Sequence, residues 1–190
     1  MLRSALFFLI LGPMAGCGGG LPPSIDAAGI EEDRLLGRRF DKLAMTAPAD
    51  LPTGSARYNG RLGGGITGDY DGRIIGDLEL TVDFSSGGLE GQISAINITD
   101  RDGVPTQTLG GRLDLTGATD DGVLDAEARG GVRIRDAEGV TRRSDLVLSL
   151  DGRVRSFDAD GDAVAGGVSG RMTGDVELRI FDGYFYGQEP

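Results

Sequence analysis

The chain has 190 residues, of which 30 are acidic, 19 are basic and none is histidine, and its net charge is −11 at pH 7. The lack of histidine excludes Ser-His-Asp and Cys-His catalysis and histidine-ligated zinc, iron or haem sites. The negative charge opposes binding to DNA, RNA or an anionic membrane, so no nucleic-acid partner is expected. A glycosidase built on two carboxylates stays open by residue type alone. The acids, however, alternate with apolar residues as solvated faces do, and no enzyme activity is expected.

Residues 1–16 have the design of a secretory signal peptide. Arg3 provides the cationic start, and the apolar core from Ala5 to Leu11 is far shorter than the roughly 20 residues of a spanning helix. The end of this segment, at Met14 to Cys17, resembles a bacterial lipoprotein signal. That resemblance implies cleavage before Cys17, covalent lipid on Cys17 as the only attached group, and no other cofactor. The alternative is an ordinary secretory signal that leaves Cys17 as a free thiol.

Loss of residues 1–16 removes one basic residue and no acid, which changes the net charge from −11 to −12. Membrane contact is therefore expected through lipid, and stable anchoring takes two or more acyl chains such as palmitate. Gly18 follows the cysteine where, by the lipoprotein sorting rule, an Asp would favour the inner membrane. The resemblance thus implies a lipid-anchored protein of the outer membrane, facing either the cell surface or the periplasm.

Residues 17–54 are expected to form a lipidated tether followed by a short helix. The sequence GGGLPPS is flexible and then stiff, as in a spacer. Residues 29–45 contain apolar side chains at helical spacing, interrupted by Gly37. We expect this helix to pack on one end of the following domain, and the bolder interpretation is a functional plug.

From residue 55 to residue 190 the apolar period changes to two, which is typical of half-buried strands. Asp-Gly pairs punctuate the segment and favour tight hairpin turns; they begin at Asp71, Asp102, Asp121, Asp151, Asp160 and Asp182. The pattern predicts about eight strands, near 56–63, 75–84, 88–98, 109–116, 122–135, 143–155, 163–172 and 176–186.

The fold class expected from this pattern is all-β, an antiparallel eight-stranded β-barrel that is soluble and apolar inside. Glycine accounts for 34 of the 190 residues, well above the average share, and glycine allows the bends by which a sheet closes. A transmembrane barrel would carry aromatic girdles, whereas aromatic residues are scarce here. Eight strands leave room for side chains or one small ligand.

Two weaker candidate sites lie in the barrel segment. Asp158, Asp160 and Asp162 have a spacing that can chelate calcium, although Gly161 comes too early for an EF-hand loop, and the alternative is a plain acidic turn. Tyr184, Phe185 and Tyr186 form an aromatic cluster that is a candidate contact for a ligand or partner. Its alternative role is core closure by the final strand.

Three segments of the chain resemble a known family. They are LPTGSARYNG at 51–60, GDLELTVDFSSGGLEGQIS at 76–94 and GYFYG at 183–187. They are similar to the β-barrel domain of transferrin-binding-protein-like surface lipoproteins, over about residues 40–187. The resemblance implies a cell-surface binding module that captures an iron source, a haem carrier or a host protein and passes it to an outer-membrane receptor. The single barrel, without a second lobe, argues against capture in the manner of a two-lobed receptor.

Two functional classes follow from the sequence. In the first, the chain is such a binding module for an iron or haem source or a protein partner. In the second, it is a structural or interaction lipoprotein of the cell envelope that captures nothing. Exposed apolar or aromatic loops at one barrel end would favour the first class, and a uniformly polar rim the second.

Overall fold

A computed structural model describes residues 21–136, 138–156 and 161–190 of the chain. One helix, α1 (Ala27–Asp41), and a single 3₁₀ turn, η1 (Pro48–Asp50), precede the strands. The strands are β1 (Ser55–Gly68), β2 (Gly72–Asp83), β3 (Gly88–Thr99), β4 (Pro105–Thr108), β5 (Leu113–Asp120), β6 (Val123–Arg135), β7 (Thr141–Ser156), β8 (Asp162–Gly174) and β9 (Leu178–Gln188).

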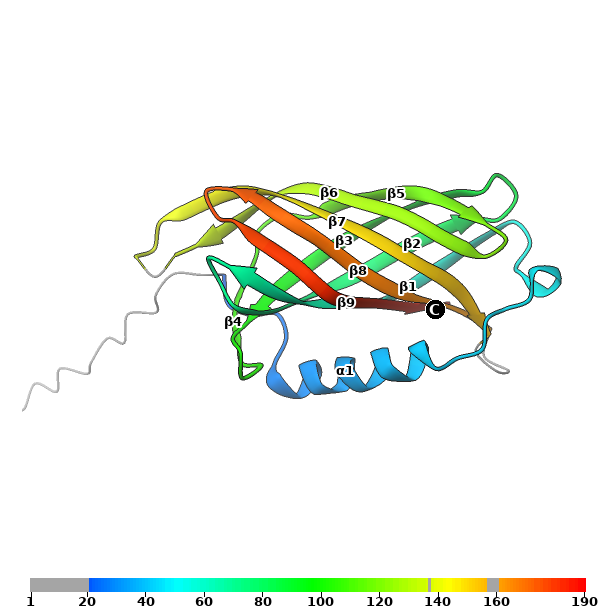
Figure 1. Ribbon diagram of the computed structural model, residues 1–190, viewed down its shortest axis with the longest axis horizontal. Helices are drawn as coiled ribbons and strands as arrows, with labels where there is room; N and C mark the ends of the chain where they lie inside the picture. The colour runs from blue at the N-terminus through cyan, green and yellow to red at the C-terminus, as the bar shows by residue number, and fades with distance from the viewer. Residues whose placement is uncertain (1–20, 137, 157–160) are drawn as a thin grey trace, which may run out of the picture.

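Eight of these strands close into an antiparallel barrel, as the sequence predicts. Neighbours in the chain pair around the sheet, except that β3 pairs with β5, and β9 pairs with β1 to close it. The short β4 adds to one end of β3 outside the closed ring. Figure 1 shows the barrel as an elongated cylinder of tilted strands with α1 lying along one side. Because β9 is bonded on both edges, the last strand of the chain is fully paired.

The expected strand at 109–116 differs from the structure. Its residues divide between the end of a connecting segment and β5, while β4 lies upstream of the expected start. Leu109 donates its N–H to Ile96 at 2.7 Å, and Gly110 exchanges two backbone hydrogen bonds with Arg133. Gly111 then adopts a φ of 119°, a conformation that favours glycine and ends the run. The chain here crosses from one partner strand to another.

The Asp-Gly pairs have three different outcomes. Asp121 and Gly122 both have positive φ and form a two-residue turn between β5 and β6, as predicted. The pairs at Asp71 and Asp102 also lie at chain reversals. The prediction of a turn is wrong at Asp151, which lies inside β7, and at Asp182, which lies inside β9 next to a register shift. Asp160 lies outside the described residues.

The barrel core consists of the inward side chains of all eight strands. The alternation of burial along β6 and β7 places Leu, Val, Ile and Ala inside and charged residues outside. These side chains form one continuous buried cluster, which Phe185 joins from β9. An eight-stranded barrel has little interior volume beyond what its side chains fill. Within the described residues, no helix is long and apolar enough to cross a membrane.

Candidate functional site

Helix α1 lies against the outer wall of the barrel, over β8 and β9, and not on the barrel end where the sequence predicts it (Figure 1). Asp26 caps its N-terminus, since the Asp26 carboxylate accepts a hydrogen bond from Gly29 N–H at 2.8 Å. The residues that face the wall recur at helical spacing: Ile30, Asp33, Gly37 and Phe40. One row of residues along the helix thus packs on the wall, and one residue of this row, Asp33, is charged.

Asp33 is the buried charge beneath α1, with only 1% of its surface exposed. Its Oδ1 accepts a hydrogen bond from the Tyr186 hydroxyl at 2.8 Å, and its Oδ2 accepts one from the Tyr184 hydroxyl. A buried carboxylate is costly unless such donors satisfy it. Two tyrosines of the last strand therefore hold a helix from the first part of the chain.

Aromatic packing surrounds this pair of hydrogen bonds. Phe40 stacks on Tyr186 with ring centroids 4.9 Å apart and an interplanar angle of 12°. Gly37 lies over the ring of Tyr184, where an added Cβ would come within 2.8 Å of a ring carbon. Ala163 and Ala165 of β8 complete the small hydrophobic cluster outside the barrel. The close approach of helix to wall depends on the missing side chain at Gly37.

The ionisation of this cluster is shifted by its burial. Desolvation raises the pKa of Asp33 above its ordinary value of 3.8, while the tyrosine hydrogen bonds and the positive charges of Arg61 and Arg73 act in the opposite direction. Desolvation and the hydrogen bonds to Asp33 raise the pKa values of Tyr184 and Tyr186. Both tyrosines therefore stay protonated at neutral pH and remain donors to the carboxylate.

The structure places the predicted aromatic cluster on two sides of the barrel wall. Phe185 points inward, where its ring lies against Gly152 and Gly166, while Tyr184 and Tyr186 point outward under α1. Tyr186 is buried and Tyr184 is half-buried. Contact of these three residues with a ligand or partner stays a prediction, and in this conformation only Tyr184 has appreciable exposure.

A groove of about 660 Å³ runs along the wall beside the C-terminal half of α1. Its lining includes five glycines, namely Gly37, Gly152, Gly166, Gly167 and Gly183. At Gly167 an added Cβ would meet no atom nearer than 3.9 Å, which shows how much space is free there. The groove contains backbone surface that a partner can approach closely.

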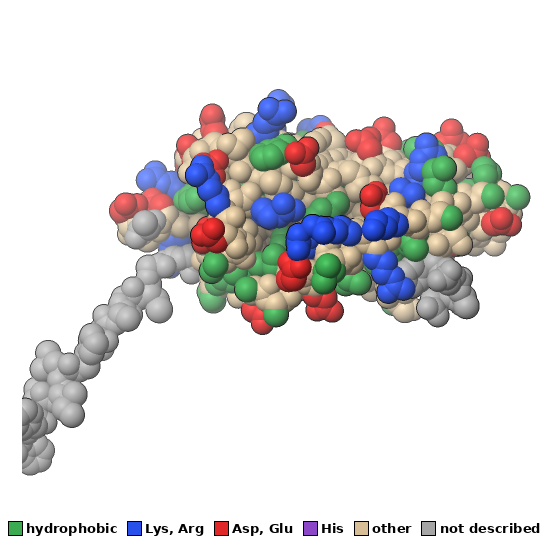
Figure 2. All heavy atoms as spheres, turned by 60° about the horizontal axis from the view of Figure 1, so that its bottom comes forward, with side chains coloured by type: hydrophobic (Ala, Val, Ile, Leu, Met, Phe, Trp, Pro, Cys, Tyr) green, Lys and Arg blue, Asp and Glu red, His purple; other side chains and the backbone are tan. Residues whose placement is uncertain are grey.

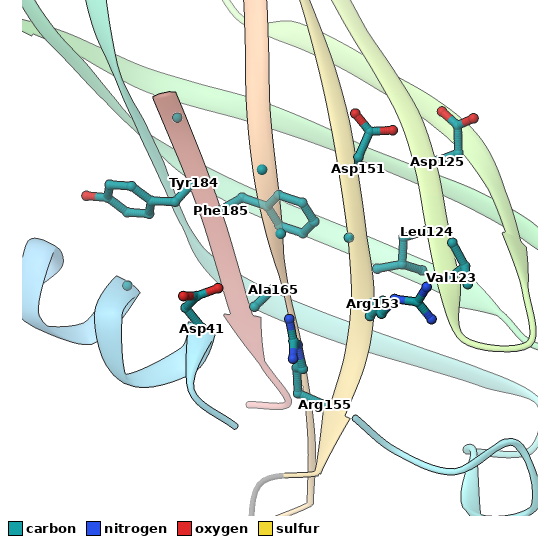
Figure 3. A pocket seen from close by; sticks show the side chains of 15 residues that line it. Asp41, Val123, Leu124, Asp125, Asp151, Arg153, Arg155, Ala165, Tyr184 and Phe185 are labelled. Atoms are coloured by element: carbon teal, nitrogen blue, oxygen red, sulfur yellow. The ribbon is translucent and has the colours of Figure 1, made fainter. Parts of the chain in front are cut away.

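Charged side chains of both signs line this groove (Figure 3). Asp125 of β6 and Asp151 of β7 are directly opposite each other across the two strands. Arg153 and Arg155 lie further along β7, toward the end of α1 that carries Asp41 (Figure 3). Arg155 donates from Nη1 to the Leu43 carbonyl at 3.0 Å, while its buried Nε has no hydrogen-bond partner among the described residues. The arrangement suits a polar segment that carries both charges.

Several site residues predicted from the sequence lie outside the described residues or away from the groove. Cys17, Asp158 and Asp160 lie outside the described residues, so the lipid site and the calcium candidate stay predictions. Asp162, the described member of the calcium candidate, accepts a hydrogen bond from the Thr46 hydroxyl at 3.2 Å. In the described part of the chain, no group of three or more Cys, Asp or Glu side chains is arranged to hold a metal ion.

Asp33, Arg155 and the groove glycines were not predicted from the sequence. One signal for Asp33 was present, because it occupies the same helical stripe as Ile30 and Phe40, where an acid has no place without a partner. Nothing in the local pattern connects Asp33 with tyrosines 151 and 153 residues away. Comparisons with protein-family models, with curated proteins and with solved structures gave no match.

Proposed function

We propose that this chain is a lipid-anchored lipoprotein of the outer membrane whose barrel binds a protein partner on its outer wall. The observation that carries the proposal is the filled interior: inward side chains form one continuous cluster, which favours binding outside the barrel. The groove beside α1 is a concave outer surface that brings glycine backbone and both signs of charge together. Such a surface fits an extended polar segment of another protein.

The resemblance of the sequence to transferrin-binding-protein-like lipoproteins supports a partner class. On that basis the partner is a protein that carries iron or haem, or the outer-membrane receptor that accepts this cargo. The three acids and two arginines of the groove would pair with complementary charges on such a protein. The barrel itself provides rigidity, and lipid on Cys17 holds it at the envelope.

The anchor is tested by growing cells with labelled palmitate and comparing the natural chain with Cys17→Ala. We expect label only on the natural chain, together with its recovery in the membrane fraction. Equal membrane recovery of both chains, without label, would contradict lipid anchoring.

The binding surface is tested by placing a photo-crosslinking residue at Gly167 in intact cells grown with and without iron. The matched control is Asn59 of β1, an exposed strand residue outside the groove. We expect a protein adduct at position 167 that increases under iron starvation and is absent at position 59. Equal adducts at both positions would rule out the groove as the specific surface.

A further inference from the structure

A second surface on the barrel has a different character from the groove beside α1. It is a hollow of about 390 Å³ at the point where the described chain begins, and eight residues line it, none of them acidic. We call it the arginine groove, after Arg133, Arg135 and Arg143, which surround Leu21, Thr108 and Gly110. The lining of this hollow has three exposed arginines and no acid, in a chain with 30 acidic and 19 basic residues. The nearest acids lie outside the lining: Asp145 lines an adjoining hollow with Arg133 and Arg143, and the Asp175 carboxylate accepts a hydrogen bond from the Arg143 backbone N–H at 3.0 Å.

The arginines are placed against each other by the sheet. Arg133 of β6 is directly opposite Arg143 of β7, and like charges in such cross-strand positions are destabilising. None of the three arginines forms an ion pair within residues 21–136, 138–156 and 161–190. The nearby Asp136 carboxylate is instead paired with Arg142 at 3.0 Å. An external anion would relieve this repulsion.

The start of the described chain is fixed beside these arginines. Thr108 donates its N–H to the Leu21 carbonyl at 3.0 Å, and its hydroxyl donates to the Pro22 carbonyl at 3.0 Å. The side chains of Leu21 and Arg133 both lie next to Gly110, since a Cβ there would be 3.5 Å from an atom of each. Leu21 is therefore held at the arginine groove and cannot swing away with the tether.

Covalent geometry then limits where a lipid on Cys17 can be. Three residues separate Cys17 from Leu21, and the four residue-to-residue steps between them span at most about 14 Å in a fully extended chain. If the bilayer begins at the acylated cysteine, the arginine groove lies within that distance of the lipid headgroups. At physiological ionic strength the Debye length is about 8 Å, so the three arginines experience the membrane surface when the link between Cys17 and Leu21 is shorter than its fully extended length.

Three exposed apolar residues lie at the same end of the barrel as the arginine groove, while Met45 and Val123 are exposed at the opposite end. Leu21 is 56% exposed, Val104 between β3 and β4 is 52% exposed, and Val140 between β6 and β7 is 48% exposed. Figure 1 shows β4 and the β6–β7 turn at the end where the described chain begins. The face that carries α1 is different, because its basic side chains are interspersed with acidic ones (Figure 2). Apolar tips beside arginines are typical of surfaces that rest on a membrane interface.

We propose that the arginine groove binds the anionic headgroups of membrane phospholipids next to the anchor, and that this contact orients the barrel. The proposal rests on the lipid anchor of the proposed function. It holds the end with the β3–β4 and β6–β7 turns against the bilayer, and it presents the opposite end, with the β2–β3 and β5–β6 turns, to the surroundings. Arginine suits this role because its planar fork matches phosphate oxygens and stays charged.

The orientation is tested on the mature acylated protein in lipid nanodiscs. A donor dye is attached at Ser85→Cys, an exposed position between β2 and β3, and an acceptor dye is placed on lipid headgroups. Nanodiscs of phosphatidylcholine with 30% phosphatidylglycerol are compared with pure phosphatidylcholine. We expect lower energy transfer in the anionic nanodiscs, where docking holds the dye away from the bilayer, and loss of this difference in 1 M salt.

The decisive variant is Arg133→Gln/Arg135→Gln/Arg143→Gln. Each arginine near an anionic surface contributes about fivefold to the docking equilibrium, so the triple change should weaken docking about a hundredfold. The control variant Arg38→Gln/Arg57→Gln/Arg129→Gln removes the same charge from exposed arginines elsewhere on the protein and should dock as the natural protein does. Equal energy transfer in all three proteins, or equal transfer in both lipids, would overturn the proposal.

Intact mass of the same samples separates the two proposals. A lipid-modified Cys17 together with no preferred orientation overturns the docking surface and leaves the anchor intact. An unmodified Cys17 overturns the anchor, and the docking surface falls with it. Loss of a crosslinked protein partner in the triple arginine variant, with unchanged energy transfer, would assign the arginine groove to protein binding and also overturn the proposal.

Discussion

A carboxylate that is removed from water must be matched by donors, and Asp33 meets this condition with two phenol hydroxyls. Each hydrogen bond to a charged group contributes about 1.5–3 kcal/mol, and loss of both partners would leave a buried charge. The raised pKa of Asp33 shows that burial outweighs the hydrogen bonds and the nearby arginines in setting its ionisation. This residue therefore makes the contact between α1 and the wall dependent on pH.

The sign of that dependence follows from proton binding. Because the folded pKa of Asp33 lies above the unfolded value of 3.8, the native state binds more protons between the two values. The contribution of Asp33 to stability is present in full below pH 3.8 and falls as pH rises through the folded pKa. Between pH 3.8 and the folded pKa of Asp33, the free energy of unfolding falls by up to about 1.4 kcal/mol per pH unit.

Asp33→Asn should remove this pH dependence while it keeps an oxygen acceptor for one tyrosine. We expect the difference in unfolding free energy between Asp33→Asn and the natural chain to change in favour of the variant as pH rises from 4 to 7. Urea denaturation at a series of pH values measures it. The control Glu32→Gln changes an exposed acid on the same helix. A difference that stays constant over this range for Asp33→Asn would contradict the raised pKa.

At the residue scale, the side of the sheet on which a side chain lies was easier to predict from the sequence than the distant residue that it contacts. Tyr184, Phe185 and Tyr186 were predicted as one aromatic cluster, whereas the alternation of side chains along a strand places Phe185 on the side opposite the two tyrosines, as the structure has it. The part of the barrel wall that α1 covers depends on hydrogen bonds between Asp33 and tyrosines more than 150 residues later in the chain. A pattern read over short windows contains no information at that separation.

At the scale of elements, Gly37 decides how closely α1 approaches the barrel. Glycine inside a helix costs about 1 kcal/mol relative to alanine, so its presence here needs a packing reason. The reason is the ring of Tyr184, which occupies the space that a Cβ would take. The sequence analysis treated this glycine as an interruption of the helix, whereas it is the point of closest contact.

Gly37→Val should lift α1 from the wall without opening the barrel. The added atoms would overlap the Tyr184 ring, and overpacking of this kind costs about 1–3 kcal/mol. We expect faster hydrogen exchange in residues 27–41 and little change in the strands. Arg38→Val introduces the same β-branched side chain on the exposed face and is the control. Unchanged exchange in α1 of the Gly37 variant would show that the ring moves aside.

Strand positions were predictable because the alternation of apolar and polar residues is a local pattern. The exceptions are positions where a neighbouring strand decides the local structure. Seven expected strands match observed ones within a few residues, whereas 109–116 is wrong because Gly110 and Gly111 connect β4 and β5, which pair with different parts of β3. The Asp-Gly pair at 182 is wrong as a turn because Asp182, with a φ of 47°, lies at a bulge inside β9. The same dipeptide suits a turn or a bulge, and only the neighbouring strand distinguishes them.

At the scale of the whole molecule, the barrel depends on the seam between β1 and β9. Gly60 lies at this seam opposite Gly187, and an added Cβ at Gly60 would come within 1.9 Å of the Tyr186 carbonyl oxygen. The neighbouring residue Asn59, by contrast, is exposed to solvent. The seam therefore tolerates a side chain at Asn59 and not at Gly60.

Gly60→Val should open the seam and destabilise the barrel by about 2 kcal/mol or more, because backbone hydrogen bonds of β1 with β9 are lost. Two unpaired strand edges would then be exposed and would promote self-association. Thermal unfolding and light scattering measure both effects, with Asn59→Val as the control. A Gly60 variant that stays monomeric and unfolds at the same temperature as the control would contradict this role of the seam.

Closure of the sheet was predictable from the number of strands and the glycine content, but the position of α1 was not. A barrel of eight strands has two ends and a whole circumference on which one helix can lie. The choice is made by tertiary contacts such as Asp33 with the tyrosines, and by the hydrogen bonds of Leu21 and Pro22 that fix the start of the described chain.

The pairing of the first strand with the last has a consequence for biogenesis. The 11 residues of β9 provide the second neighbour of both β1 and β8, so neither strand can complete its hydrogen bonding until β9 has been synthesised. Local hairpins can form early, but the ring cannot close before β9 emerges from the ribosome. The unclosed chain is the form that export through a narrow channel would require under the proposed function.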